Sequence, residues 1–357
     1  MNFFHILFYI IIGFFILIFF FQLFLSIPRL NRTKYTGEPD FKTLVVLPCK
    51  GTDYNQRQNF RSLCNQEYKR YKIVAVVDSD EDPAIDSLKS ENIEYLISSN
   101  NTKGSGKVKA ITTAIRKNRD YDAYIIADSD IYVGSKWLKK MLQPLLDDSY
   151  GISTTFPYFS PVDGFWSKFK TAWGFVGNSM MQSKMTVFGW GGSLAFRNSL
   201  VNDEDLNWFD TNISDDMALT EICKRNNKKI AYVEDAGVTI FSPDNWKVFR
   251  EWSLRQTSLL LSNKKRAYSL GVLIYGSSSL LIAGSTILSI FISPLFSVLF
   301  LPLLLNEIKM YLRLREKKFV FIFIQILLPF FYVWNLWKGN KQEKIVWRGI
   351  TYDLYKN

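Results

Sequence analysis

Histidine is almost absent from this sequence: among 357 residues there is one, His5, and it lies in an apolar run. A zinc site built on histidine and a Ser-His-Asp triad both require this residue, so both are excluded for the soluble part of the chain. The only cysteines, Cys49, Cys64 and Cys223, are odd in number and have no metal-ligand spacing, which fits a reducing compartment. Acid–base chemistry must therefore depend on aspartate and glutamate.

Charge is missing from residues 3–27, where only His5, Gln22 and Ser26 interrupt an apolar run long enough to cross a bilayer. A cleaved signal peptide would show a basic start, a shorter apolar core and a small-residue cleavage site, and these features are not evident. We therefore predict a transmembrane anchor over residues 1–28.

Two further apolar zones lie near the C-terminus. Residues 268–311 have the length of a hairpin of two membrane segments, and residues 319–337 form a third segment. We expect membrane segments over 268–337, followed by a basic tail over 338–357. Because both flanks of the third segment are basic, either it turns back at Pro329 or the tail is exported.

The net charge of +11 fits attraction to an anionic inner leaflet. Arg29, Arg32 and Lys34 follow the anchor, and no charge precedes it, so the positive-inside rule places the next domain in the cytoplasm. A nucleic-acid partner is the alternative explanation of the charge, but the chain has no basic-aromatic binding motif and we predict no such partner.

Between residues 29 and 240, short β-branched runs alternate with helical patterns. Val108, Ile111 and Ile115 recur at helical spacing. This alternation predicts an α/β domain with a mainly parallel sheet, which binds ligands at the carboxyl ends of its strands. The predicted strands are 44–48, 72–78, 94–98, 123–128 and 151–156.

Aspartates follow two of these strands. Asp128 and Asp130 come directly after residues 123–127, and Asp78, followed by Asp80, ends residues 72–78. Carboxylates at neighbouring strand ends repel each other unless a cation lies between them, and Mg²⁺ or Mn²⁺ that also holds a diphosphate would supply it. The alternative is that these aspartates only form turns, as is common at strand ends.

A third acidic site is Asp215 with Asp216, in the predicted first turn of a helix that Ser214 caps. The helix dipole alone would explain both acids. However, a glycine-rich stretch at residues 187–197 lies just upstream, where glycine lets the backbone approach a ligand closely.

Residues 241–267 contain an amphipathic helical pattern with Trp252 and Arg255 near one face. A helix of this kind lies on a membrane surface with its aromatic residues at the headgroup level. Its arginine would also be suited to neutralising a leaving diphosphate.

In this order the motifs resemble those of family 2 inverting glycosyltransferases with a GT-A fold, and most of all the ceramide glucosyltransferase group. The likeness spans nearly the whole chain. The stretches that carry it are LPCKGTDYNQRQNFRSLCNQEY (47–68), VVDSDEDPAID (76–86), GSGKVKAIT (104–112), ADSDI (127–131), SDDMAL (214–219) and IVWRGITYDL (345–354). The Q-x-x-R-W motif of the group falls on residues 252–256, which keep the arginine and lack the other two residues.

The resemblance implies a role for each matching residue in transferring a hexose, with glucose expected, from a UDP-sugar to a lipid hydroxyl such as that of ceramide or a diacylglycerol. Asp216 would be the catalytic base, with Asp215 and Arg255 beside it. The residues implied for the nucleotide sugar are Lys50, Asp78, Asp80, Lys107 and Asp128. Asp128 and Asp130 would hold Mn²⁺ or Mg²⁺. The acceptor would meet Trp190, Gly191, Gly192 and Trp252.

Three other functions compete with this one. A processive polysaccharide synthase and a polyprenyl-phosphate hexosyltransferase share the acidic motifs, although a synthase needs more membrane helices for its pore. An inactive membrane scaffold is the alternative from a different class, and it would show no metal-dependent affinity for UDP.

Overall fold

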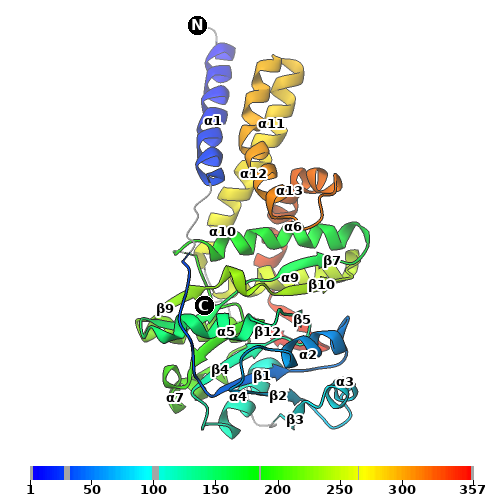
Figure 1. The fold of residues 1–357 in the computed structure, drawn as a ribbon. Helices are drawn as coiled ribbons and strands as arrows, with labels where there is room; N and C mark the ends of the chain where they lie inside the picture. The colour runs from blue at the N-terminus through cyan, green and yellow to red at the C-terminus, as the bar shows by residue number, and fades with distance from the viewer. Residues whose placement is uncertain (1–2, 28–32, 99–103, 185, 264, 355–357) are drawn as a thin grey trace. The chain divides into compact units, whose positions relative to one another are not determined.

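The computed structural model describes residues 3–27, 33–98, 104–184, 186–263 and 265–354. Arg29 and Arg32, two of the basic residues expected to orient the anchor, lie outside the described residues. The chain forms two compact units (Figure 1). We call Leu30–Asp244 the sheet unit, and Met1–Arg29 with Asn245–Asn357 the helical unit.

The sheet unit is built on a central sheet in the order β3-β2-β1-β4-β8-β6-β9. Every pairing is parallel except the two made by β8, which is antiparallel to both β4 and β6. The five predicted strands are present to within two residues at their ends, which confirms the mixed α/β class with a parallel core. The strands are β1 (Thr43–Pro48), β2 (Tyr71–Val77), β3 (Glu94–Ile97), β4 (Ala123–Ala127), β6 (Tyr150–Thr154), β8 (Ser193–Arg197) and β9 (Lys229–Tyr232).

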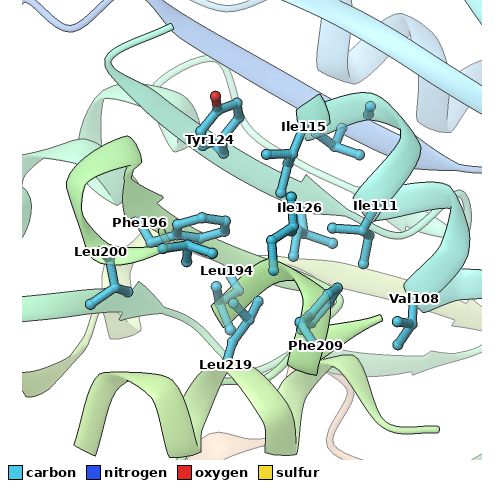
Figure 2. Packing of buried hydrophobic residues seen from close by; sticks show 14 of the residues in the cluster. Val108, Ile111, Ile115, Tyr124, Ile126, Leu194, Phe196, Leu200, Phe209 and Leu219 are labelled. Atoms are coloured by element: carbon cyan, nitrogen blue, oxygen red, sulfur yellow. The ribbon is translucent and has the colours of Figure 1, made fainter. Parts of the chain in front are cut away.

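The core of the sheet unit forms because the central strands β1, β4 and β8 are buried on both faces. On one face, Val108, Ile111 and Ile115 are at most 2% exposed, so the predicted helical spacing does mark a buried face. They share one cluster with Ile126 of β4 and Phe209 (Figure 2). Burial of each such side chain contributes about 1.5–3 kcal/mol. This packing fixes helix α4, and with it the residues of its first turn, against the sheet.

Further helices and a second sheet complete this unit. The helices are α2 (Gln56–Cys64), α3 (Ala84–Ser90), α4 (Gly106–Lys117), α5 (Trp137–Leu142), α6 (Gly164–Met181), α7 (Asp203–Phe209) and α8 (Asp215–Arg225), and short 3-10 helices span Gln143–Leu146, Asn198–Leu200 and Glu234–Ala236. The second sheet has the order β5-β10-β7, with β5 (Ile131–Tyr132), β7 (Tyr158–Pro161) and β10 (Thr239–Ser242).

The helical unit contains the apolar segments. Among the described residues, four helices are long and apolar enough to cross a membrane: His5–Ser26, Arg266–Phe291, Pro294–Arg313 and Val320–Asn340. Its elements are α1 (Phe3–Ser26), α9 (Trp246–Asn263), α10 (Lys265–Gly271), a π-helical turn (Val272–Gly276), α11 (Ser277–Phe291), a 3-10 helix (Pro294–Phe300), α12 (Leu301–Arg313), α13 (Val320–Asn340), β11 (Lys344–Trp347) and β12 (Ile350–Asp353).

Polar side chains join helices within this unit. The Gln22 amide donates hydrogen bonds of 2.7 Å to Ser277 Oγ and to the carbonyl of Ile274, in the π-helical turn. Ser26 donates to the carbonyl of Pro302 at 3.2 Å. These bonds satisfy polar groups that would otherwise be costly among apolar helices, and they tie α1 to the π-helical turn, to α11 and to α12.

Two features of the C-terminal region add to the expectation. One of the two alternatives for the third apolar segment, a turn at Pro329, is not present, because α13 continues through Pro329 as one helix of 21 residues. The basic tail also contains the β11–β12 hairpin, which we did not predict. Arg348 and Gly349 form its turn with positive φ angles of 50° and 80°, as two-residue hairpin turns require.

Candidate active site

The carboxyl ends of β1, β2 and β4 meet at one edge of the central sheet because the three strands are parallel neighbours. Lys50 follows β1, Asp78 follows β2 and Asp128 follows β4. The chain passes from β1 to β2 and β3 on one side, whereas β4 lies on the other side of β1. Such a switch in strand order leaves a crevice at the carboxyl edge, the usual ligand position in α/β sheets.

On the β1–β2 side of this edge, Lys50 and Asp78 form an ion pair with 2.8 Å between Nζ and Oδ2. Asp82, to which the sequence assigned no role, accepts hydrogen bonds of 2.9 Å from the backbone N–H groups of Gly51 and Ala84 and so holds the turn after β1. Asp80, in contrast, is exposed. Of the three aspartates predicted to bind the nucleotide sugar, Asp78 has a charged partner on this side of the edge, whereas Asp80 is exposed.

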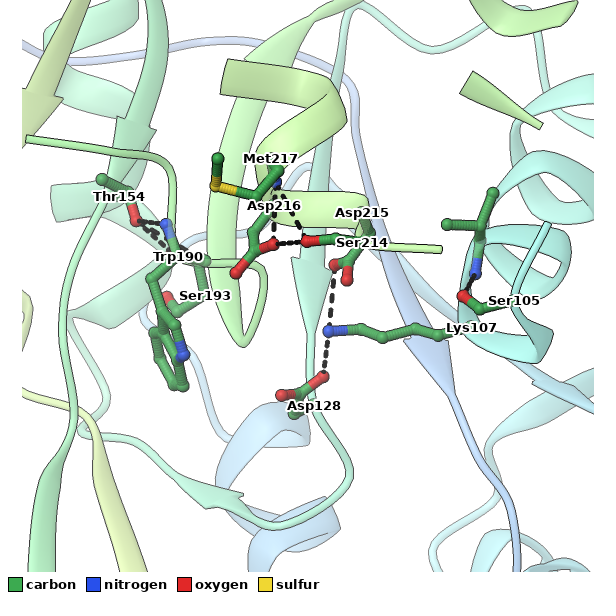
Figure 3. A network of polar contacts seen from close by, with 11 residues as sticks. Ser105, Lys107, Asp128, Thr154, Trp190, Ser193, Ser214, Asp215, Asp216 and Met217 are labelled. Atoms are coloured by element: carbon green, nitrogen blue, oxygen red, sulfur yellow. Dashed lines mark hydrogen bonds and ion pairs between the residues drawn. The ribbon is translucent and has the colours of Figure 1, made fainter. Parts of the chain in front are cut away.

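On the β4 side, Lys107 lies between two carboxylates (Figure 3). Its Nζ is 2.7 Å from Asp128 Oδ1 and 3.0 Å from Asp215 Oδ2. Only 12% of the Lys107 side chain and 6% of the Asp215 side chain are exposed. Three predicted site residues, from three separate motifs, thus form one ionic network in which the Lys107 and Asp215 side chains are largely buried.

Local structure holds Lys107 in this position. It belongs to the first turn of α4, whose N-cap residue Ser105 accepts a hydrogen bond of 3.3 Å from the N–H of Val108. The preceding Gly104 donates at 2.9 Å to the carbonyl of Asp210. A Cβ atom at Gly104 would lie 2.6 Å from that carbonyl oxygen, so only glycine allows this close approach, which ties the start of α4 to the segment before α8.

The network shifts the pKa of both Lys107 and Asp215. Burial lowers the pKa of Lys107, but the charges of Asp128 and Asp215 outweigh it and raise that pKa above its ordinary range. Burial raises the pKa of Asp215 to about 6. Lys107 opposes this shift only in part, because it shares its charge with Asp128, and the charges of Asp216 and Asp128 add to it.

Asp215 and Asp216 are neighbours in the chain with different surroundings. Asp215 is turned toward Lys107, whereas Asp216 lies on the side of Trp190 (Figure 3). One oxygen of Asp216, Oδ1, accepts hydrogen bonds from the Ser214 hydroxyl and, at 2.7 Å, from the N–H of Met217. Ser214 is the N-cap of α8, as predicted. The carboxylate of Asp216 is therefore held through Oδ1 and needs no lysine partner to fix it.

The glycine-rich stretch packs directly on this network. A Cβ atom on Gly191 would lie 2.1 Å from Asp215 Oδ2, and one on Gly192 would lie 2.1 Å from the ring of Trp190. The backbone of Trp190 is also held in place, because its amide N–H donates a hydrogen bond of 2.9 Å to Thr154 Oγ1. Sequence reasoning missed Thr154, although its position at the end of β6 marks the same edge of the sheet.

The donor set at the end of β4 fits a hard divalent cation. Asp128 and the half-buried Asp130 supply carboxylate oxygens two residues apart. Within the described part of the chain, no three His, Cys, Asp or Glu residues are grouped closely enough to hold a metal by themselves. Two carboxylates and the oxygens of a diphosphate would together suit Mg²⁺ or Mn²⁺, which commonly bind with the substrate phosphates.

The two remaining predicted residues, Trp252 and Arg255, belong to α9 of the helical unit. Arg255 has its guanidinium carbon 5.5 Å from the ring centroid of Trp347 in the C-terminal hairpin. The ring of Trp252 lies 6.2 Å from that of Phe249. Within their own unit, both residues therefore have aromatic neighbours.

The family of the chain follows from comparison with known proteins. A family model described as glycosyl transferase family 21 matches residues 13–357. The chain belongs to glycosyl transferase family 21. The protein is thus a glycosyltransferase, although the expected family number, 2, was wrong. The comparison with curated proteins gave no significant match.

One of the solved structures that match supports the fold. The protein is similar to the mannosyltransferase PcManGT from Pyrobaculum calidifontis, solved with GDP-Man and Mn²⁺: the identity is 13%, the match covers 91% of this chain and 95% of that one, and the TM-score is 0.57. This likeness confirms the GT-A fold. Glucosyl-3-phosphoglycerate synthase from Mycobacterium tuberculosis also matches, with 13% identity over 65% of this chain and 85% of that one and a TM-score of 0.42.

Proposed function

We propose that this family 21 protein is a membrane-bound inverting glycosyltransferase that moves a hexose, with glucose expected, from a UDP-sugar to the hydroxyl of a lipid. The observation that carries the proposal is the buried Asp128–Lys107–Asp215 network with Asp216 adjacent to it, at the ligand-binding edge of a GT-A sheet. The lipid acceptor is supported by the four membrane-length helices of the same chain.

The donor would lie along the strand ends. Asp78 and Lys50 would contact the nucleoside side, and Asp128 and Asp130 would hold Mn²⁺ or Mg²⁺. The bound ion would neutralise the diphosphate. Lys107 is the cation that the protein itself supplies here, and its raised pKa keeps it charged at neutral pH. It would stabilise the negative charge of the departing UDP.

Asp216 is the proposed base. The acceptor hydroxyl oxygen attacks the anomeric carbon while the bond from that carbon to the diphosphate oxygen breaks, and the hydroxyl proton passes to Asp216. Attack from the face opposite UDP inverts the anomeric configuration. Asp215 is paired with Lys107 and so would position the lysine, leaving its neighbour to take the proton.

The acceptor would approach on the side of Asp216 where Trp190, Gly191 and Gly192 lie. In the helical unit, α9 with Trp252 and Arg255 would lie along the membrane surface, as its amphipathic pattern suggests.

We place the sheet unit in the cytoplasm because basic residues such as Lys34 and Lys318 flank the apolar segments. The proposed organisation is an anchor (1–28), a catalytic domain (29–240), an interface helix (241–267), membrane segments (268–337) and a basic tail.

Product analysis tests this function. The purified full-length protein would be incubated with Mn²⁺ or Mg²⁺, a panel of nucleotide sugars and a mixed lipid extract, and the lipids then analysed by mass spectrometry. One added hexose on a hydroxylated lipid is the expected result. A sugar polymer would show a processive synthase, and a hexosyl polyprenyl phosphate would show the related transferase. No metal-dependent use of any donor would leave an inactive scaffold.

A further inference from the structure

An aromatic cluster borders the glycine-rich stretch of the sheet unit. The ring centroid of Phe156 lies 6.3 Å from that of Phe188 and 5.9 Å from that of Trp190. All three side chains are half-buried, so part of each ring stays accessible. Phe156 also meets the buried Phe159 at 6.3 Å. We call the three accessible residues, Phe156, Phe188 and Trp190, the aromatic wall.

The aromatic wall lies at the active-site edge of the sheet. Phe156 follows β6, which runs parallel to β4, and Phe188 and Trp190 precede β8, which runs antiparallel to it. All three thus flank strand ends at the edge that carries Asp128. The chain passes from Trp190 directly to Gly191, whose backbone packs on Asp215. Trp190 and Asp216 lie on the same side of the ionic network (Figure 3).

Contacts with glycine backbone fix two rings of the aromatic wall, those of Phe156 and Trp190. A Cβ atom on Gly177 of α6 would lie 2.2 Å from the Phe156 ring, so a glycine at this position lets the ring pack directly on the helix backbone. On the other side, the Trp190 ring packs on Gly192, and the Trp190 backbone is bonded to Thr154. Rings fixed in this way present a defined surface, because little side-chain entropy remains to be lost when a ligand binds.

The arrangement of the rings favours an alkyl chain as the ligand. The planes of Phe156 and Phe188 are 78° apart, and those of Phe156 and Trp190 are 56° apart. These rings therefore offer alternating edges and faces rather than the single flat platform on which a sugar ring stacks. An alkyl chain has no preferred face and gains free energy in proportion to the apolar area it buries.

We propose that the aromatic wall contacts the first carbons of the acceptor next to its nucleophilic hydroxyl, and that it determines whether the sugar passes to lipid or to water. This inference rests on the proposed function. With the chain bound, the acceptor oxygen attacks the anomeric carbon and UDP leaves. With the chain absent, water can take that position, so that the products are free hexose and UDP, with the proton again passing to Asp216.

Phe188 gives the sharpest test, because it lies in a loop and its substitution removes part of the aromatic wall without disturbing a strand. For the full-length Phe188→Ala protein we expect kcat/KM for an alkyl alcohol to fall about tenfold or more whatever its chain length, because every such acceptor carries the first carbons that contact the aromatic wall. Free hexose should rise relative to glycolipid. Phe188→Leu, which keeps apolar volume, should restore most of the preference for lipid over water.

A matched control is Phe41→Ala. Phe41 is also half-buried, but it precedes β1 and so lies at the opposite edge of the sheet, where the guanidinium carbon of Arg197 is 5.5 Å from its ring. This variant should leave the ratio of transfer to hydrolysis unchanged. An unaltered ratio of transfer to hydrolysis in Phe188→Ala would overturn the proposal.

A second readout does not depend on turnover. A long-chain alcohol that carries a diazirine on its first chain carbons would be photolysed with the full-length protein, and the labelled residues mapped by mass spectrometry. We expect labels on the aromatic wall and fewer in Phe188→Ala. Labels there without turnover by any donor would refute the proposed function while supporting this site. Turnover with labels only elsewhere would refute the site alone.

Discussion

Replacing Gly191 with alanine should disable the site through one methyl group. The added Cβ would lie 2.1 Å from Asp215 Oδ2, whereas an ordinary van der Waals contact begins at 3.4 Å. The carboxylate or the loop must therefore move by about 1.3 Å, the difference between these distances. Since Asp215 Oδ2 is now 3.0 Å from Lys107 Nζ, a displacement of the carboxylate away from Gly191 disturbs the geometry of this ion pair.

The expected cost follows from that displacement. Misplacing a catalytic group by about 1 Å costs on the order of 100-fold in rate, so Gly191→Ala should lower kcat about 100-fold. Initial rates of glycolipid formation would measure this effect. The control is Gly134→Ala in the same unit. A Cβ at Gly134 meets no atom within 4 Å, so this variant should have the kcat of the wild type. Wild-type kcat in Gly191→Ala would refute the assigned contact between the glycine and Asp215.

Further expectations concern the charges at the site. Lys107→Met leaves Asp128 and Asp215 without their shared cation and should lower the free energy of unfolding by about 3–5 kcal/mol. Denaturant titration measures this change. An unchanged unfolding midpoint would contradict the ionic network. Because the folded-state pKa of Asp215 is raised from 3.8 to about 6, this group contributes stability below about pH 4 that is lost as the pH rises through about 6. Melting curves of Asp215→Asn should therefore show a smaller fall in stability between pH 4 and 6 than those of the wild type, and parallel curves would argue against the shift. Chelation with EDTA should abolish glycosyl transfer, and added Mn²⁺ should restore it. The Asp130→Ala variant should need a higher Mn²⁺ concentration for the same rate. Transfer that continues after chelation would contradict the proposed metal dependence.

Much of the fold was predictable because local signals agree with the tertiary structure. The strands β1, β2 and β4 are continuous apolar runs, and the spacing of Val108, Ile111 and Ile115 matches the buried face of α4. β8 (Ser193–Arg197) was missed, since it follows directly on glycines that indicated a loop close to a ligand. Its antiparallel position between β4 and β6 depends on pairings that no local pattern encodes.

The contacts within the candidate site could not be predicted from the sequence, although the residues that make them were singled out there. Strand-end positions indicated Asp78 and Asp128, whereas their partners come from distant segments that the sheet order brings together. Lys107, for example, pairs with Asp215 more than 100 residues away in the chain. The different surroundings of Asp215 and Asp216 likewise depend on burial and side-chain direction, which adjacent identical residues cannot reveal in sequence.

The central claim is that Asp216 takes the proton of the acceptor hydroxyl. The most direct test is to compare Asp216→Asn with the wild type in donor binding by calorimetry and in single-turnover transfer to lipid. The substitution keeps the size of the side chain and removes its basicity. We predict unchanged affinity for the donor and a loss of transfer by at least about 100-fold. Transfer by Asp216→Asn at a rate close to that of the wild type would contradict the account.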